Sequence, residues 1–451
     1  MLKERIEFLC KKKNITRKQL VEGLVTATHF ANILADRYPL PCDLAIALAT
    51  RLGVQTSYIT NVSKREQDVL QQAEYVFMEF SSALANVAHD EKKGNEMTGG
   101  REGIKFKELT EQNNLLYDDH HDALIVELTV ALMKSTYYEQ IGDLTAYQYI
   151  HEHYLDFYLH KYIYKNENRL PRPLKKALLF YEIYKHRSQN EYAGMLRSAS
   201  KLEPQLVVGS DVWYMIRSVQ LEGSVHTTQY EQAYYIFEQL LKHNVENKRE
   251  DRLSSLYVAH SGNCFAAGMY EDALMALTKA EYYLSTAKQG EELQSTIFNN
   301  RIVMLTMLGQ NDQALAEIED YEAWLANRSP AIQRATSSTL LIYRGELAYI
   351  EKNWGELGGV LHRLNGESLN LEQAMAKLFY CSQFALSQGD SESFLKYSLE
   401  CLPYFEQSAQ RLRLEQLYEL LAIVSEENRK YKDAAIYYRK LLGLVRNSEA
   451  R

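Results

Sequence analysis

The amino-acid sequence predicts an all-α protein, with an N-terminal helix-turn-helix domain followed by a right-handed α-solenoid. Residues 253–325 hold two copies of one pattern: an apolar helical stripe, a glycine-containing turn, and a second helix opened by an acidic residue and a small alanine. Helical hairpins that recur at fixed spacing indicate an α-solenoid. Seven prolines and 33 tyrosines among 451 residues also suit stacked helices better than sheets.

Composition narrows the class of protein further. No run of 18 apolar residues occurs, and the N-terminus alternates charged with apolar residues, so we expect neither a membrane span nor a secretory signal. The five cysteines are odd in number and scattered, which favours reduced thiols and a cytoplasmic location. Residues 1–65 carry a net charge of +6 and the remainder −14, for a total of −8. This asymmetry predicts that only the N-terminal part meets a polyanion.

The N-terminal domain, residues 1–64, is predicted to contain five short helices. An amphipathic helix over 1–12 is followed by a capping box from Thr16 to Gln19 and a second helix over 17–22. A tight turn at 23–25 leads to a third helix ending near residue 35, and a fourth helix over 43–52 is stopped by Gly53. A short turn between the second and third helices is the helix-turn-helix layout.

The strings Ile15-Thr-Arg-Lys-Gln-Leu-Val-Glu and Leu48-Ala-Thr-Arg-Leu-Gly-Val54 resemble the Xre/Cro class of DNA-binding domains. The third helix departs from that class, because Asn32-Ile33-Leu34 stands where members often have Arg-Ile-Glu, so a base preference is not transferred. Geometry predicts that exposed side chains at the start of this helix read bases of a double-stranded DNA operator and that nearby cations contact phosphates. The predicted base-reading residues are Ala27, Thr28, His29 and Asn32, and the predicted phosphate contacts are Arg17, Lys18 and Arg37. The alternative is a vestigial or protein-binding helical domain.

Residues 65–115 are predicted to form a connecting helix over 66–89 and a mobile polar loop over 90–103. The glycines of this loop lack the G-K-[ST] sequence and preceding strand of a phosphate-binding loop. Residues 116–451 then repeat the turn signature, with an earlier, degenerate copy at Gly142. Equivalent positions lie 37 to 43 residues apart, at Tyr192, Tyr230, Tyr270, Asn311, Trp354, Ser391 and Tyr431. This pattern resembles tetratricopeptide repeats with slightly lengthened helices.

The first helix of each hairpin should line a concave wall that binds an extended peptide. Amides on this wall can hydrogen-bond a peptide backbone, and apolar neighbours can hold its side chains. The alternative is that these residues make ordinary inter-helix contacts. The predicted wall residues are Ser218, Glu222, Phe265, Asn299, Val303, Ile342, Glu346, Tyr349, Phe379, Gln383 and Glu419.

The sequence predicts no enzyme, no cofactor and no metal site. Neighbouring histidines and carboxylates at 118–122 and 151–153 lack the spacing of a zinc helix, and adjacent residues on a helix point apart. No pair of residues arranged for nucleophilic or acid–base catalysis stands out.

An Xre-like domain joined to tetratricopeptide repeats resembles the RRNPP family of quorum-sensing regulators of Gram-positive bacteria. The resemblance implies a cytoplasmic homodimer, a short signalling peptide bound in the repeat groove, and peptide-dependent control of transcription. It also implies that Asn299 and Asn300 hold the peptide backbone. Two alternatives stay open: a regulator whose repeats bind a partner protein or only dimerise, and a scaffold that inhibits a signalling enzyme without binding DNA.

Overall fold

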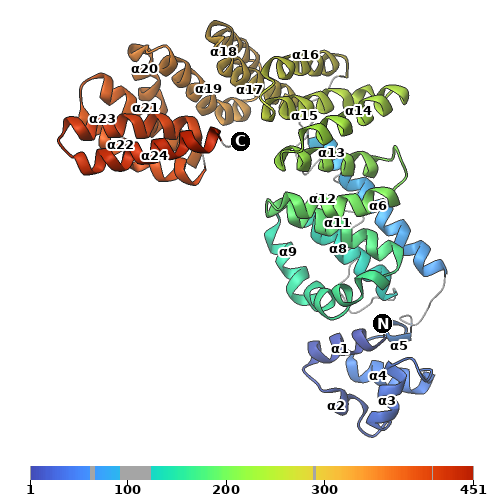
Figure 1. Ribbon diagram of the computed structural model, residues 1–451. Helices are drawn as coiled ribbons and strands as arrows, with labels where there is room; N and C mark the ends of the chain where they lie inside the picture. Colours follow the sequence, from blue (N-terminus) through green and yellow to red (C-terminus); the bar gives the residue numbers. More distant parts are fainter. Residues whose placement is uncertain (1, 61–66, 92–122, 288–290, 409, 450–451) are drawn as a thin grey trace. The chain divides into compact units, whose positions relative to one another are not determined.

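The computed structural model describes residues 2–60, 67–91, 123–287, 291–408 and 410–449, and all regular structure in these ranges is helical (Figure 1). The predicted all-α fold class is therefore confirmed. The chain divides into two compact units, residues 1–294 and 295–451, and each has its own core. This division falls inside α17 (Glu291–Met307), where the sequence indicated no boundary. The limits 1–64, 65–115 and 116–451 stay a prediction.

The N-terminal domain has the five predicted helices. These are α1 (Leu2–Lys13), α2 (Arg17–Val21), α3 (Ala27–Leu34), α4 (Cys42–Leu52) and α5 (Thr56–Thr60). The predicted capping box of α2 is present, because Thr16 accepts from the Gln19 amide and the Gln19 side chain accepts from the Thr16 amide at 2.8 Å. Thr26 caps α3 in the same sense, and Gly53 ends α4 with φ at +67°.

The first helix also fastens this domain to the rest of the first unit. Arg5 and Glu127 of α8 (Leu124–Gln140) form an ion pair of 2.6 Å, with their side chains 0% and 1% exposed. Arg5 donates from Nη1 to the carbonyl oxygen of Tyr58 at 2.6 Å, and Tyr154 donates to Glu127 at 2.9 Å. Phe8 packs beside Tyr154, with ring centroids 5.3 Å apart. The contact is made by α1 and leaves the start of α3 exposed.

Two long helices form the centre of the first unit. α6 (Gln67–Glu91) lies where the sequence predicts a helix over 66–89, and it packs against α8, α11 (Arg172–Ser188) and α13 (Asp211–His226). α8 is buried from residue 124 to residue 136, and this stretch includes the charged Glu127 and Lys134 among its apolar residues. The predicted polar loop begins within α6 and otherwise lies outside the described residues.

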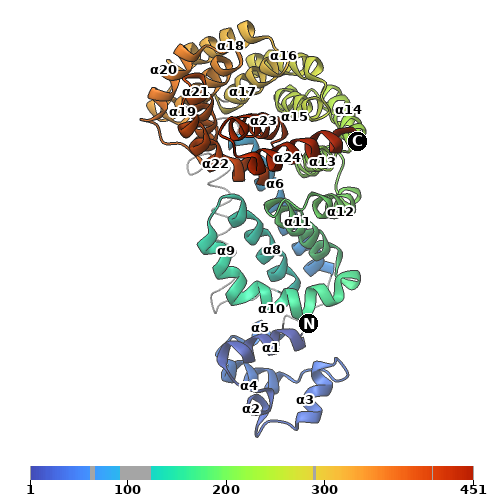
Figure 2. The same ribbon diagram turned by 60° about the vertical axis from the view of Figure 1, so that its left-hand side comes forward.

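Helical hairpins complete both units, and Figure 2 shows them from a second side. In the first unit, α9 (Leu144–Ile150) continues through two π-helical turns, η2 (His151–Leu155) and η3 (Leu159–Ile163), on either side of α10 (Asp156–Tyr158), into η4 (Tyr164–Arg169). The hairpins that follow are completed by α12 (Tyr192–Leu202), α14 (Tyr230–Glu246), α15 (Leu253–Ala266) and α16 (Tyr270–Ala287), with the short turns η5 (Glu203–Gln205) and η6 (Glu250–Arg252). The second unit contains α18 (Asn311–Leu325), α19 (Pro330–Ile350), α20 (Trp354–Leu364), α21 (Leu371–Ser387), α22 (Ser391–Gln407), α23 (Arg411–Glu427) and α24 (Tyr431–Glu449).

Each repeated turn is built by the same local hydrogen bonds. After α15, the amide of Gly268 bonds to the carbonyl of Phe265 at 2.9 Å and that of Met269 to Cys264 at 2.8 Å. This is a Schellman motif, which needs a residue with positive φ two positions before the next helix. The residues in this conformation are Gly142, Asn190, Thr228, Gly268, Gly309, Lys352, Gly389 and Arg429. The seven predicted repeat positions are therefore the first residues of α12, α14, α16, α18, α20, α22 and α24.

Candidate ligand cavities and nucleic-acid interface

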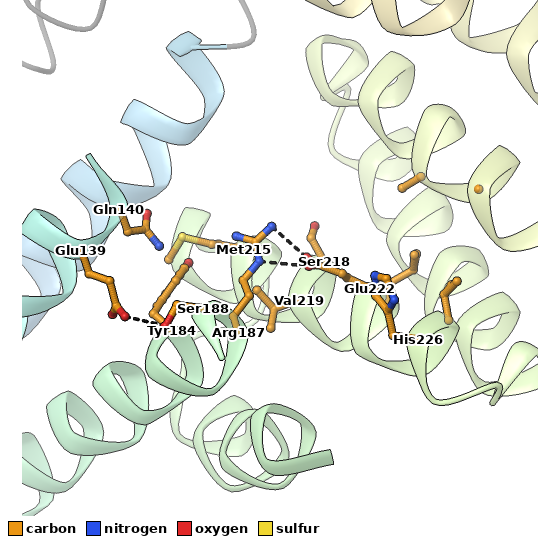
Figure 3. A pocket seen from close by; sticks show the side chains of 14 residues that line it. Glu139, Gln140, Tyr184, Arg187, Ser188, Met215, Ser218, Val219, Glu222 and His226 are labelled. Carbon is orange, nitrogen blue, oxygen red and sulfur yellow. Dashed lines mark hydrogen bonds and ion pairs between the residues drawn. The ribbon is translucent and has the colours of Figure 1, made fainter. Parts of the chain in front are cut away.

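The first unit contains a cavity of about 790 Å³ on the faces of four first helices, α8, α11, α13 and α15 (Figure 3). Its wall is part polar and part apolar, with Met215 and Val219 beside charged groups that Figure 3 labels. No atom lies within 4 Å of where a side chain on Gly262 would begin, so this glycine keeps one side of the cavity open. The lining residues are Glu139, Gln140, Tyr184, Arg187, Ser188, Met215, Ser218, Val219, Leu221, Glu222, Val225, His226, Ala259 and Gly262.

A two-pronged ion pair crosses this cavity. Arg187 donates from Nε and Nη2 to the two carboxylate oxygens of Glu222, at 3.0 and 2.9 Å (Figure 3). Burial lowers the pKa of Arg187, while the Glu222 carboxylate together with Tyr184 and Tyr192 raises it, and the net shift is upward. Such a pair is geometrically specific and holds both side chains in place.

Glu139 supplies a second carboxylate that is only half satisfied. Its Oε1 accepts from the Ser188 hydroxyl at 2.6 Å, whereas its buried Oε2 has no hydrogen-bond partner among the residues that the structure describes. Burial raises the pKa of the adjacent Tyr184 to about 12, which keeps its hydroxyl protonated. With Arg187 neutralised by Glu222, the uncompensated charge of this wall is that of Glu139.

The second unit contains its own cavity of about 480 Å³, lined by residues of α17, α19, α21, α22 and α23. Arg413 is ion-paired with Glu346 and lies 4.2 Å from the ring centroid of Phe379. Tyr380 also donates to Glu346, at 2.7 Å. Apolar side chains such as Val303 and Ile342 also line this cavity.

The predicted peptide-binding residues are distributed over both cavities. Glu222 lines the first, as does Ser218, and Val303, Ile342 and Glu346 line the second. Asn299 accepts from the hydroxyl of Tyr343, a residue of the second cavity, at 3.2 Å. The predicted wall residues that line neither cavity are Phe265, Asn299, Asn300, Tyr349, Phe379, Gln383 and Glu419.

Two of those assignments need correction. Phe379 is 0% exposed and Gln383 is 4% exposed, and neither lines any of the described cavities, so packing between helices occupies both side chains. Phe379 packs edge-on against Tyr349, with ring centroids 5.2 Å apart, so the ring of Tyr349 also takes part in contacts between helices. The helical projection placed these residues on the wrong face because α21 is covered by both α19 and α22.

The sequence reasoning missed the α8 and α11 residues of the first cavity, Glu139, Tyr184 and Arg187 among them. A signal for them was present, since Gly142 and Asn190 end these helices in the same positive-φ turn as the later copies. Projection from these turns would have reached the faces that line the cavity. The predicted wall residues begin at Ser218 of α13.

The predicted DNA-reading residues lie at the start of α3. Ala27, Thr28 and His29 are exposed, and His29 stacks on Tyr38 with ring centroids 5.5 Å apart. Asn32 is half-buried, and its side-chain oxygen accepts from Arg37 at 3.2 Å. Because the oxygen is engaged by Arg37, the side-chain nitrogen of Asn32 is the group that can donate a hydrogen bond to a base edge.

The predicted phosphate contacts lie on the surface around α2. Lys18 and Arg37 are exposed, and Arg17 is 46% exposed and ion-paired with Glu7 of α1. Such an exposed pair contributes little to stability. Arg17 can therefore exchange Glu7 for a phosphate at small cost.

No group of three or more His, Cys, Asp or Glu that could hold a metal occurs in the described ranges, and the residues at 118–122 lie outside them. His151 is engaged by Ser135 at 2.8 Å and Asp156 at 2.7 Å, which accounts for it structurally. Within the described helices, none combines the length and apolar character that crossing a membrane requires.

Comparison with solved structures shows the fold. A Rap protein complexed with competence and sporulation factor is similar with a TM-score of 0.52 and 14% identity, over 86% of this chain and 100% of that chain. Aspartyl phosphate phosphatase F from Bacillus subtilis is similar with a TM-score of 0.46 and 15% identity, over 83% of this chain and 93% of that chain. PlcR of Bacillus thuringiensis in complex with the peptide PapR7 and DNA is similar with a TM-score of 0.33 and 13% identity, over 75% of this chain and 98% of that chain. No family model and no curated protein matches. The expected helical-repeat fold is confirmed by the first of these structures.

Proposed function

We propose that this chain is a cytoplasmic transcriptional regulator that binds DNA through its N-terminal domain and is switched by a short signalling peptide. The observation that carries the proposal is the cavity of about 790 Å³ on four successive first helices. Its size lies in the range of small-ligand sites, and its wall combines apolar surface with a few placed polar groups. The Rap protein of the same fold was crystallised with competence and sporulation factor, which supports a signalling ligand here.

The chemistry of the cavity favours a peptide with a basic side chain. Arg187 is neutralised by Glu222, and Oε2 of Glu139 is without a partner among the described residues. A lysine or arginine of the ligand would satisfy this oxygen with a charge-assisted hydrogen bond. Met215 and Val219 would cover the apolar part of the same peptide.

The DNA-binding part of the proposal rests on exposure and charge. Ala27, Thr28 and His29 are exposed at the start of α3, which is the end that enters the major groove in helix-turn-helix proteins. Residues 1–65 carry a net charge of +6. The ion pair of Arg5 and Glu127 couples this domain to α8, whose last turn supplies Glu139 to the cavity. In a homodimer, a peptide-driven shift of these helices would change the separation of two DNA-binding domains and hence their fit to paired half-sites.

A selection experiment tests the peptide. A random heptapeptide library is passed over the full-length chain, and bound peptides are sequenced. We expect lysine or arginine to be enriched at one position, and this enrichment to disappear in Glu139→Gln. The matched control is Glu356→Gln, which removes an exposed carboxylate of the second unit that pairs with Arg363 and should leave selection unchanged. Failure to recover any peptide would exclude a peptide receptor and favour a protein-binding or purely dimerising repeat unit.

Binding to random duplex DNA at several salt concentrations tests the N-terminal domain. We expect affinity to fall steeply with salt, and the double variant Arg17→Ala, Lys18→Ala to have a slope smaller by about 2. Lys242→Ala, which removes a cation 77% exposed on α14, is the control and should change neither affinity nor slope. Salt-independent or absent binding would instead support a scaffold that does not use DNA.

A further inference from the structure

A second, smaller pocket of about 200 Å³ opens beside the ligand cavity of the first unit. The two share Met215, Ser218, Leu221 and Ala259, so the pocket adjoins the cavity along these residues. The pocket extends behind the wall of first helices to α14, and Leu240 and Leu256 are among its apolar residues. Its volume suits one side chain and not a run of peptide backbone.

Two polar side chains in this pocket have hydrogen-bonding capacity to spare. Asn244 is 2% exposed, and its Oδ1 has no partner among the described residues. Arg252 has two such groups, Nε and Nη1, while its Nη2 is held by Asp211 and its guanidinium lies 4.2 Å from the ring centroid of Tyr214. A buried acceptor or donor without a partner is costly, which indicates that a bound group completes this site.

The charge around the pocket selects the kind of group. Asp211 and Asp251 are balanced by Arg249 and Arg252, because Arg249 lies 3.6 Å from Asp211 and 3.1 Å from Asp251. This neutral cluster favours neither an anion nor a cation. The free groups are one carbonyl acceptor and two N–H donors, and a carboxamide presents the complementary set, two N–H donors and one acceptor. A carboxylate would place oxygen against Oδ1 of Asn244, and an ammonium would face the guanidinium of Arg252.

We propose that this pocket binds the carboxamide of an asparagine or glutamine side chain of the peptide ligand. The ligand carbonyl accepts from Arg252, the ligand amide donates to Asn244, and the methylenes pack against Leu240 and Leu256. The inference rests on the proposed function, since it names one side chain of that peptide. It adds Asn244 as a determinant of peptide specificity. Asn244 lies on α14, the second helix of its hairpin, whereas the wall residues predicted from the sequence lie on first helices.

The heptapeptide selection is repeated with Asn244→Leu and Asn244→Asp, and folding of each variant is checked by circular dichroism and thermal unfolding. The full-length chain should enrich asparagine or glutamine at one position. The leucine variant, which removes the acceptor, should lose this enrichment, and the aspartate variant, which adds a carboxylate to the pocket that Arg252 lines, should reduce it. Asn327→Leu, an exposed asparagine of the second unit, is the matched control and should select like the parent.

A recovered peptide and its leucine-substituted form are then compared by calorimetry. The parent chain should bind the amide form at least tenfold more tightly, and Asn244→Leu should not distinguish the two. Peptides recovered without amide enrichment, or enrichment that persists in Asn244→Leu, would overturn this inference and leave the proposed function standing. Recovery of no peptide by the parent chain would overturn both.

Discussion

The buried ion pair between Arg5 and Glu127 gives the sharpest prediction. Both side chains are almost fully enclosed, 0% and 1% exposed, and Tyr154 donates to the same carboxylate. Burial raises the pKa of Tyr154 well above its usual value, so this hydroxyl remains a donor. Glu127→Gln keeps the shape but leaves the guanidinium of Arg5 without its buried counter-charge. Removing one partner of a buried pair costs about 3–5 kcal/mol.

Hydrogen exchange of α1 and α5 measures this cost without assuming that the whole chain unfolds in one step. A loss of about 3 kcal/mol speeds exchange roughly a hundredfold, since every 1.4 kcal/mol is tenfold. The matched control is Glu7→Gln, on the same helix as Arg5. Glu7 pairs with Arg17 at the surface, with side chains 21% and 46% exposed, so its replacement should cost under about 1 kcal/mol.

A combined variant checks the reasoning from the other direction. Arg5→Met, Glu127→Leu and Tyr154→Phe together replace the polar group by apolar side chains. Because the desolvation cost of both charges disappears, this variant should be more stable than Glu127→Gln alone. Equal exchange rates in Glu127→Gln and Glu7→Gln would refute the claim that the buried pair fastens the N-terminal domain to α8.

Three further predictions concern local stability. Burial lowers the pKa of Lys134 from 10.5 to about 8, so the unfolded chain binds more protons between these values and stability rises with pH there. Lys134→Met should therefore stabilise the first unit at pH 7, by up to about 3 kcal/mol, and urea unfolding should show this gain shrinking as the pH rises from 8 toward 10.5. Thr26→Ala removes the cap of α3 and should cost about 1 kcal/mol, seen as faster exchange at the start of that helix. Lys352→Gly should stabilise the second unit and Gly309→Ala should destabilise it, each by about 1 kcal/mol in thermal unfolding, because both positions have positive φ, +56° and +70°.

The repeat turns show what the sequence determined by itself. A Schellman turn depends on hydrogen bonds between residues three to five positions apart, so its composition is visible in a short window. All seven predicted positions, from Tyr192 to Tyr431, are the first residues of second helices. Glycine alone would not have found them, since Lys352 and Arg429 also take positive φ. The capping box at Thr16 was predictable for the same reason.

The ligand-binding surfaces were decided only by tertiary packing. Phe379 and Gln383 fit the periodicity of an exposed wall, yet neighbouring helices cover them. Arg5 and Glu127 are far apart in sequence, and no local pattern marks their pairing. Asn244 becomes a candidate ligand contact because α13, α14 and α15 enclose it. Local hydrogen bonds set where helices begin and end, whereas the face that stays open depends on contacts between distant segments.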